Sequence, residues 1–240
     1  MRRFFVDKKN IKEHTIEIRG NEWNHLFHVL RQKENDRMIC FCGDGNDYHC
    51  IIEKILDDVA ICKIEKVEPS NKTPHHNVTL FQGALKLDKF EFLIQKMSEL
   101  GLKEIVPFES AFSIAKVKSE KWERYQKIAS EASKQCQRAD VLSVGAPLSF
   151  KNMLTKLKEY DIVLFAYEKE TKNTLQNLNL SEYQNIAFVI GSEGGFSQSE
   201  SEALSEAGVT TITLGKRILR AETASIAMAS IIMHLLGELS

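Results

Sequence analysis

The sequence predicts an α/β protein in which a small β-rich domain precedes a larger domain built on a mostly parallel sheet. Three observations support this class. Short segments rich in Ile, Val and Cys dominate the first part of the chain, and from Val78 onward strand and helix patterns alternate. Ile186 to Ile190 is a nearly continuous apolar run, as expected for a strand covered on both faces of a parallel sheet. We therefore predict domains at residues 1–70 and 78–240, joined by a linker at 71–77.

The amino-terminal domain should be a small barrel with one helix. Its predicted strands, separated by turns such as Gly43-Asp44-Gly45, are Thr15 to Ile18, Arg37 to Cys42, Tyr48 to Ile55 and Val59 to Val67. Asn21 can cap a helix from Glu22 to about Arg31. The apolar side chains of this helix recur at helical spacing, which predicts one buried face made of Trp23, Leu26, Phe27 and Leu30.

The segment PSNKTPHHN is polar and aperiodic, so we interpret it as the linker; its two histidines are expected to be solvated rather than metal ligands. In the carboxyl-terminal domain, strands are predicted at Val78 to Ala84, Ile105 to Phe108 and Ile162 to Tyr167. Three helix starts are predicted between these strands: Asp88 with Glu91 forms a capping pair, and Ser119 and Ser149 open the other two.

Composition limits the functional classes. Lys and Arg number 32 against 33 Asp and Glu, and the net charge is −1, so any contact with nucleic acid must be a local patch. The five cysteines form no C-x-x-C pair and no secretory leader is evident, which indicates reduced thiols in a cytoplasmic protein. No apolar run is long enough to span a membrane. We expect no metal site and no membrane partner.

Two glycine turns follow predicted strands near the end of the chain. Gly191 ends the first strand and is followed by Gly194 and Gly195, and Ser197 with Glu200 fits a capping box for a helix from Gln198 to about Ala207. The second strand, Val209 to Leu214, ends at Gly215. We expect the two strands to be neighbours whose carboxyl ends meet at one edge of the sheet, where open α/β sheets bind ligands.

Either glycine alone could be a purely structural turn residue. The two turns together carry more polar chemistry than a connection requires, because one holds Ser192 and Glu193 and the other holds Arg217, Arg220 and Glu222. Neither matches a known nucleotide signature: GSEGGF lacks the spacing of G-x-G-x-x-G, and GKRILRAET lacks the GK[ST] end of a phosphate loop. A dinucleotide or a nucleoside triphosphate is therefore not expected.

These turns resemble a known family. IGSEGGF followed by LGKRILRAETASIAM is similar to the signature of SPOUT-class RNA methyltransferases, specifically the branch that methylates N3 of a uridine in 16S ribosomal RNA. Ser192 stands where that branch usually has proline. QGALKLDKFEFLIQKMSELGLKEIVPFES and EASKQCQRADV also match, and HLFHVLRQKENDRM resembles the helix-to-strand segment of the family's amino-terminal PUA-like barrel, which binds RNA. The resemblance covers essentially the whole chain.

The resemblance implies a trefoil-knotted methyltransferase domain that binds S-adenosylmethionine in the knot, a homodimer formed by two knots, and the small ribosomal subunit or its 16S RNA as partner. The long helix after Gly215 is apolar around much of its circumference, so it must be buried in the domain or against another subunit. The cofactor contacts that we predict are Gly191, Glu193, Gly194, Gly195, Leu214, Gly215, Ile218, Leu219, Arg220 and Ala224.

Uridine N3 becomes nucleophilic only when its imide proton leaves and negative charge spreads to O2 and O4. A guanidinium suits those oxygens, so Arg138 and Arg220 are the predicted catalytic cations, with salt bridges as their alternative role. Glu222 could accept the proton or cap the last helix, and Glu193 could contact substrate or organise its loop. The predicted RNA contacts are Arg2, Arg3 and Arg31. A ribose 2′-hydroxyl target and a non-catalytic RNA-binding protein remain as alternatives.

Overall fold

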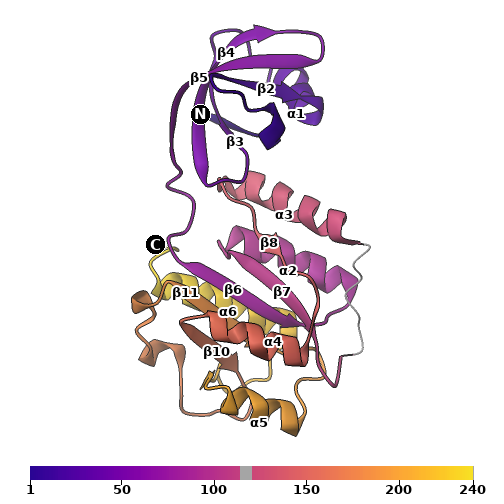
Figure 1. Ribbon diagram of the computed structural model, residues 1–240, viewed down its shortest axis with the longest axis vertical. Coiled ribbons are helices and arrows are strands. Elements are labelled where there is room, and N and C mark those ends of the chain that lie inside the picture. Colours follow the sequence, from indigo (N-terminus) through magenta and orange to yellow (C-terminus); the bar gives the residue numbers. More distant parts are fainter. Residues whose placement is uncertain (114–120, 240) are drawn as a thin grey trace. The chain divides into compact units, whose positions relative to one another are not determined.

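The computed structural model describes residues 1–113 and 121–239, which form two compact units (Figure 1). The first unit combines Met1–Thr73 with Ser133–Val141, and the second combines Pro74–Ala132 with Leu142–Ser240. The division after Thr73 falls within the segment interpreted as a linker. The grouping of Ser133–Val141 with the amino-terminal unit was not expected, because this segment lies far along the chain from that unit.

The first unit is built on a five-stranded sheet with the order β1-β3-β4-β5-β2. β1 pairs with β3 in parallel, and the other neighbours are antiparallel. The sheet packs on a core that includes Phe4, Ile16, Leu26, Met38 and Ile52. The strands are β1 (Arg2–Phe5), β2 (Thr15–Arg19), β3 (Arg37–Phe41), β4 (Asn46–Ile55) and β5 (Val59–Pro69). All but β1 were predicted.

The helix of this unit differs from the predicted one. α1 (Gly20–Asn24) begins after Arg19 without a side-chain cap, and it continues as a π-helix, η2 (His25–Val29). The wider π turn changes the angular spacing of the side chains, so the expected single apolar face does not form. Leu26 is fully buried while Phe27 is 42% exposed and stacks on Trp23. The prediction of an Asn21 cap and of an inward Phe27 was therefore wrong.

The second unit contains a fully parallel sheet with the order β12-β10-β11-β6-β7-β8, and β9 pairs with β7. Its strands are β6 (Asn77–Gly83), β7 (Glu104–Glu109), β8 (Ser143–Val144), β9 (Leu148–Ser149), β10 (Ile162–Ala166), β11 (Asn185–Ile190) and β12 (Thr210–Ile212). In the centre, β11 pairs with β6 over the whole length of β11. Because every strand runs the same way, all carboxyl ends meet at one edge.

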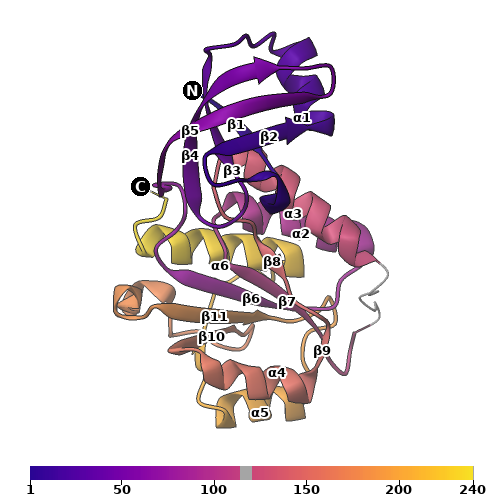
Figure 2. The ribbon, with the colours of Figure 1, turned by 45° about the horizontal axis from the view of Figure 1, so that its top comes forward.

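Helices cover both faces of this sheet. α2 (Leu87–Glu99) and α6 (Ala221–Leu235) lie against each other on one face, and α4 (Phe150–Lys156) and α5 (Gln198–Glu206) lie on the other (Figure 2). Met153 of α4 and Leu204 of α5 pack on Phe81, Val106 and Phe165 of the sheet. α3 (Trp122–Cys136) follows β7. Single 3-10 turns lie at η1 (Lys8–Asn10), η4 (Leu157–Glu159), η5 (Leu175–Asn177) and η6 (Leu180–Glu182).

The predicted strand neighbours and one predicted cap are corrected by the structure. β11 and β12 are not adjacent, because β10 pairs with both of them and lies between them. Asp88 does not cap α2: the helix begins at Leu87, two residues earlier than a cap at Asp88 would place it, and Lys86 at the cap position makes no side-chain cap. The capping box of Ser197 with Glu200 is confirmed, as is the Ser149 cap. The predicted helix start at Ser119 lies outside the described residues.

Within the described part of the chain, no helix combines the length and the apolar character that a membrane crossing requires.

Candidate functional site

A cavity of about 490 Å³ lies at the carboxyl edge of the parallel sheet, where β10, β11 and β12 end. Its volume is within the range of small-molecule sites. The wall comes from five places: the end of β10 with the residues after it, the end of β11 with its glycine turn, the loop between β12 and α6, the first turn of α6, and Lys89 at the start of α2. The lining residues are Lys89, Ala166, Tyr167, Glu168, Ile190, Gly191, Ser192, Glu193, Gly195, Phe196, Thr213, Leu214, Gly215, Arg217, Ile218, Leu219, Arg220, Ala221 and Ala224.

The turn after β11 is closed by its own backbone. The amide of Gly195 donates to the carbonyl oxygen of Ser192 at 3.0 Å, and Gly195 has a φ of +69°. A Cβ atom at Gly191 would lie 2.9 Å from the Phe196 ring, so a side chain there would displace that ring. Gly194 faces the other way, because a Cβ atom there would lie 2.8 Å from Cβ of Phe112. Gly194 does not line the cavity.

The loop between β12 and α6 forms the opposite wall. Gly215 has a φ of +105°, and a Cβ atom added there would meet open space. Its amide donates to Oγ1 of Thr213 at 3.1 Å, which fixes the bend. Ile218 on the same loop is 90% exposed. An apolar side chain so fully exposed at the edge of a cavity suits contact with a bound molecule.

Lys89 connects the two walls electrostatically. Its Nζ lies 2.7 Å from Oε1 of Glu193 in the glycine turn and 3.2 Å from Oε1 of Glu222 in the first turn of α6. The hydrogen bonds that Lys89 donates to Glu193 and, to a lesser extent, to Glu222 raise the pKa of Lys89. Burial opposes ionisation of Glu222, but its backbone amide, Lys89 and the charge of Arg220 together lower its pKa. Lys89 and Glu222 are therefore both charged at neutral pH.

This arrangement predicts a pH-dependent contribution to stability. The lowered pKa of Glu222 means that its contribution is present above its ordinary value of about 4.5 and is lost as pH falls through the folded-state value. The raised pKa of Lys89 means that its contribution is present below about 10.5 and is lost as pH rises further. We expect Lys89→Met to lower the free energy of unfolding modestly at pH 7, with the difference from wild type shrinking toward zero below about pH 4.

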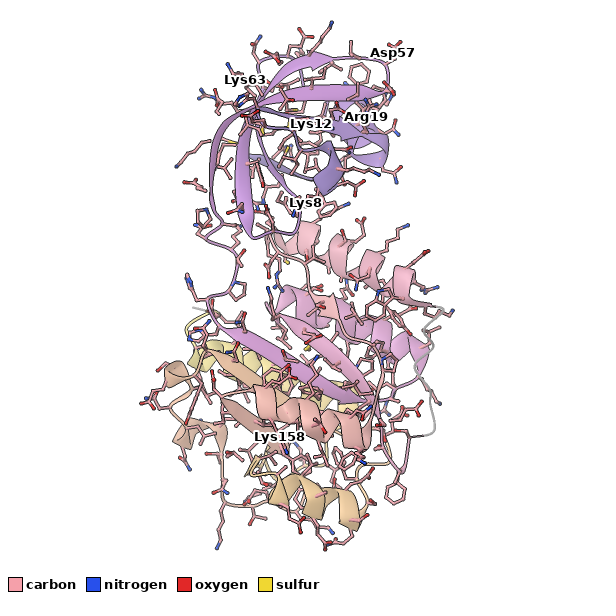
Figure 3. All side chains as sticks on the ribbon, viewed as in Figure 1. Lys8, Lys12, Arg19, Asp57, Lys63 and Lys158 are labelled. Atoms are coloured by element: carbon pink, nitrogen blue, oxygen red, sulfur yellow. The ribbon has the colours of Figure 1, made fainter. Side chains whose placement is uncertain are left out.

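Urea unfolding at several pH values measures this difference. The control is Lys158→Met, which changes an exposed lysine of the same unit (Figure 3) and should leave the pH profile of stability unchanged. An equal loss of stability for Lys89→Met at pH 3 and pH 7 would contradict the electrostatic account.

The structure brings nine of the ten predicted cofactor residues to the cavity, Gly194 being the exception. Of the predicted catalytic residues, Arg220 lines the cavity, and Glu222 lies behind Lys89. Arg138 is not a lining residue. It is only 3% exposed, groups with the amino-terminal unit, and donates through Nε to Oδ1 of Asp140 at 2.9 Å. This placement favours the salt-bridge alternative for Arg138.

The three predicted RNA-contact residues differ in their exposure to solvent. Arg2 and Arg31 are exposed, and Arg31 has a φ of +52°. Arg3 instead forms a two-pronged ion pair with Asp47, with N–O distances of 2.7 and 2.6 Å, and its side chain is 7% exposed. Its guanidinium also lies over the ring of Phe41. We therefore assign Arg3 to the stability of the unit rather than to RNA contact.

Several cavity residues were not predicted from the sequence. Tyr167 and Glu168 follow β10, whose carboxyl end lies at the same edge; the parallel order of strands could have indicated them. Lys89 belongs to a helix about a hundred residues earlier in the chain, and no local signal marks it. Among the described residues, no group of His, Cys, Asp or Glu is arranged to hold a metal ion. The site is thus a cavity of backbone amides, small residues and paired charges.

Comparison with known proteins identifies the family. A family model described as an RNA methyltransferase domain matches residues 71–233, and one described as an RNA methyltransferase PUA domain matches residues 18–65. The chain therefore belongs to the family of RNA methyltransferases that carry an amino-terminal PUA domain. The predicted fold class, a SPOUT-type methyltransferase domain with a PUA-like domain ahead of it, is confirmed.

Several curated relatives that match over most of the chain share one name. Ribosomal RNA small subunit methyltransferase E of Bacillus subtilis is 33% identical over 98% of this chain and 96% of its own length. The protein of that name from Mesomycoplasma hyopneumoniae is 33% identical over 94% of this chain and 96% of its own. A solved structure of the Neisseria gonorrhoeae enzyme of that name, bound to S-adenosyl methionine, has a TM-score of 0.84 and 28% identity, covering 98% of both chains.

Proposed function

We propose that this chain transfers the methyl group of S-adenosylmethionine to N3 of a uridine in 16S ribosomal RNA, acting in the cytoplasm on the assembled small subunit. The observation that carries the proposal is the cavity at the carboxyl edge of the sheet, with its glycine turns and Arg220. Full-length similarity to ribosomal RNA small subunit methyltransferases E, one of them solved with S-adenosyl methionine, supports it. The choice of N3 as the methylated atom rests on the sequence resemblance and on the presence of a guanidinium that can stabilise the charge on the uracil oxygens.

The cavity fits S-adenosylmethionine in size and in lining. Gly195 and Gly215 leave their backbones open to close approach by a ligand, because a Cβ atom at Gly195 would have no atom nearer than 4.0 Å and one at Gly215 would enter open space. Gly191 has a different role, because a side chain there would collide with Phe196. Leu214, Leu219 and Ala224 supply apolar surface for an aromatic base. When bound there, the cofactor supplies an electrophilic methyl group on a positively charged sulfur.

The remaining chemistry is positioning and charge stabilisation. Arg220 presents the paired donors of its guanidinium to the uracil oxygens, on which negative charge accumulates when N3 loses its proton. Lys89 adds a second positive charge within the cavity wall. The lowered pKa of Glu222 makes its carboxylate a weak proton acceptor, so we assign Glu222 to holding Lys89 and the first turn of α6. Most of the rate enhancement then comes from aligning N3 with the methyl group.

Mass spectrometry of ribosomal RNA from a deletion strain tests the proposal. We expect one 3-methyluridine in 16S RNA to disappear, and to return when the wild-type chain is expressed. Loss of a ribose 2′-O-methyl group instead would support the alternative target. An unchanged set of modified nucleosides, together with no heat of S-adenosylmethionine binding in calorimetry, would support a non-catalytic RNA-binding protein.

The amino-terminal unit is the proposed RNA-binding part. Exposed cations are distributed over it, including Lys8, Lys12 and Lys63 (Figure 3). Arg2 and Arg31 are the exposed members of the predicted set. Cations of this kind contact phosphates and position the protein without reading bases.

We expect Arg31→Ala to weaken RNA binding and to reduce the slope of log K against log salt concentration by about one. Filter binding across a salt series measures both quantities. The control is Arg19→Ala, because Arg19 is already paired with Glu17 and Asp58 at 3.0 and 3.1 Å. A salt slope for Arg31→Ala equal to that of wild type would refute the contact.

We also propose that the chain is a homodimer that pairs through α6. Ile231 and Leu235 of this helix and Phe92 of the adjacent α2 remain exposed in the single chain. Apolar side chains on two neighbouring helices form a surface that a second copy can cover.

Light scattering at micromolar concentration should give twice the mass of one chain for wild type, and Ile231→Glu should shift the protein toward the monomer. Leu56→Glu is a matched control, because Leu56 is 40% exposed against 39% for Ile231 but belongs to the amino-terminal unit. A monomeric wild type would contradict the proposal.

A further inference from the structure

A buried amide lies behind the cavity wall and touches the backbone that forms it. Gln82, at the carboxyl end of β6, is fully buried. Its Nε2 donates to the carbonyl oxygen of Gly191 and to that of Gly83, each at 3.1 Å. Burying an amide in a sheet is unfavourable unless its hydrogen bonds are satisfied, and here one N–H is satisfied by Gly191 of the turn that lines the cavity and the other by Gly83 of β6.

The other end of the same amide reaches α6. Oε1 of Gln82 accepts a hydrogen bond from Oγ of Ser225 at 2.5 Å, and that hydroxyl lies 2.9 Å from the carbonyl oxygen of Ala221. Ser225 is fully buried as well. Ala221 and Ala224, in the first turn of the same helix, line the cavity. Gln82 therefore joins both walls, the glycine turn and the beginning of α6.

Residue 83, which follows Gln82, must be glycine so that the turn after β11 can pack closely against β6. A Cβ atom at Gly83 would lie 2.3 Å from the amide nitrogen of Ser192 and 2.6 Å from the carbonyl carbon of Gly191. Both of these are backbone atoms, so no side-chain rotation could relieve the overlap. Gly83 allows the turn to approach β6, and Gln82 holds it there.

From these contacts we propose that Gln82, Gly83 and Ser225 are positioning residues for S-adenosylmethionine: they set the distance between the glycine turn and α6 that the cofactor requires. This inference rests on the proposed function. None of the three residues lines the cavity, so they act through Gly191, Ser192 and Ala221. A buried polar network of this kind fixes one arrangement of the segments it joins.

Calorimetric titration with S-adenosylmethionine tests the inference on the full chain. We expect Ser225→Ala to weaken cofactor binding about tenfold, the effect of one lost hydrogen bond at an organising position. Gln82→Met, which also removes the hydrogen bond to Gly191, should weaken it at least as much. Gly83→Ala should weaken it about a hundredfold, because the turn must move. The double variant of Gln82→Met with Ser225→Ala should bind about as weakly as Gln82→Met alone, since both substitutions break the same connection.

Ser230→Ala is the matched control. Ser230 lies on the same helix and, like Ser225, directs its hydroxyl to the carbonyl four residues earlier, at 2.8 Å from Ile226. It should leave cofactor affinity unchanged. Thermal unfolding of each variant is measured in parallel, and Ser225→Ala, which removes one oxygen, decides the outcome if Gln82→Met does not fold.

Kinetics separate positioning from general loss of structure. Positioning predicts a higher KM for S-adenosylmethionine, with kcat at saturating cofactor and KM for RNA within about threefold of wild type. A structural defect would instead lower kcat through the active fraction and leave both KM values unchanged. If wild type binds the cofactor and the folded variants bind it equally well, the positioning inference is overturned. If wild type does not bind it, the proposed function itself fails.

Discussion

Arg220→Ala should lower kcat for methyl transfer by about 10²–10³-fold, while the Kd for S-adenosylmethionine stays within about threefold of wild type. Arg220 is the exposed residue immediately before α6, and it lines the cavity. Its guanidinium is therefore available to the uracil oxygens. Because charge on those oxygens develops as N3 ionises, the interaction is stronger in the transition state than in the bound substrate.

Two further variants test whether the loss of kcat comes from the guanidinium of Arg220 in particular. Arg220→Lys keeps the charge without the planar pair of donors, so its kcat should fall between those of wild type and Arg220→Ala. Arg124→Ala, which removes an exposed guanidinium paired with Glu91 on the same unit, should leave kcat unchanged. A weaker Kd for the cofactor with unchanged kcat at saturation would instead assign Arg220 to the cofactor.

Gly215→Val should weaken S-adenosylmethionine binding by at least about a hundredfold. The Cβ of residue 215 would point into open space at the cavity, so a branched side chain would occupy volume that the cofactor needs. The φ of +105° also strains any residue with a side chain, so part of the effect could come from a shifted loop. Isothermal titration measures the affinity, and unfolding measures the strain.

Gly208→Val separates these two contributions. Gly208 has a φ of +78°, and a Cβ atom there would also meet open space, but it follows α5 and does not line the cavity. Both variants should lose stability, and only Gly215→Val should lose the cofactor. Equal cofactor affinity in the two variants would mean that the loop after β12 does not form the binding wall.

Local signals in the sequence predicted local structure well. The Ser197–Glu200 capping box forms as expected because both hydrogen bonds connect residues of one helical turn. Phe27 was misplaced because a π turn is not specified by apolar spacing. The neighbours of β12 were misplaced for another reason: strand order depends on how the whole sheet assembles, and the chain places β10 between β11 and β12.

The sequence predicted those parts of the site that lie next to a recognisable local pattern in the chain. Both glycine turns were found because Gly191, Gly195 and Gly215 follow apolar strands in the sequence. Lys89 and Gln82 were missed because they reach the site from α2 and β6, and only the folded sheet brings those segments to the same edge. Periodicity could not have indicated a knotted chain either, since knots are rare exceptions among folds; that expectation came from the family resemblance.

The most direct test of the account uses S-adenosylmethionine that carries a deuterated methyl group. The purified chain is incubated with small ribosomal subunits from a deletion strain, and the nucleosides of the 16S RNA are then analysed by mass spectrometry. We predict one deuterated 3-methyluridine with wild type and almost none with Arg220→Ala or Gly215→Val. Label on a ribose oxygen, or no label in RNA despite cofactor binding, would contradict the proposal that this cavity delivers a methyl group to uridine N3.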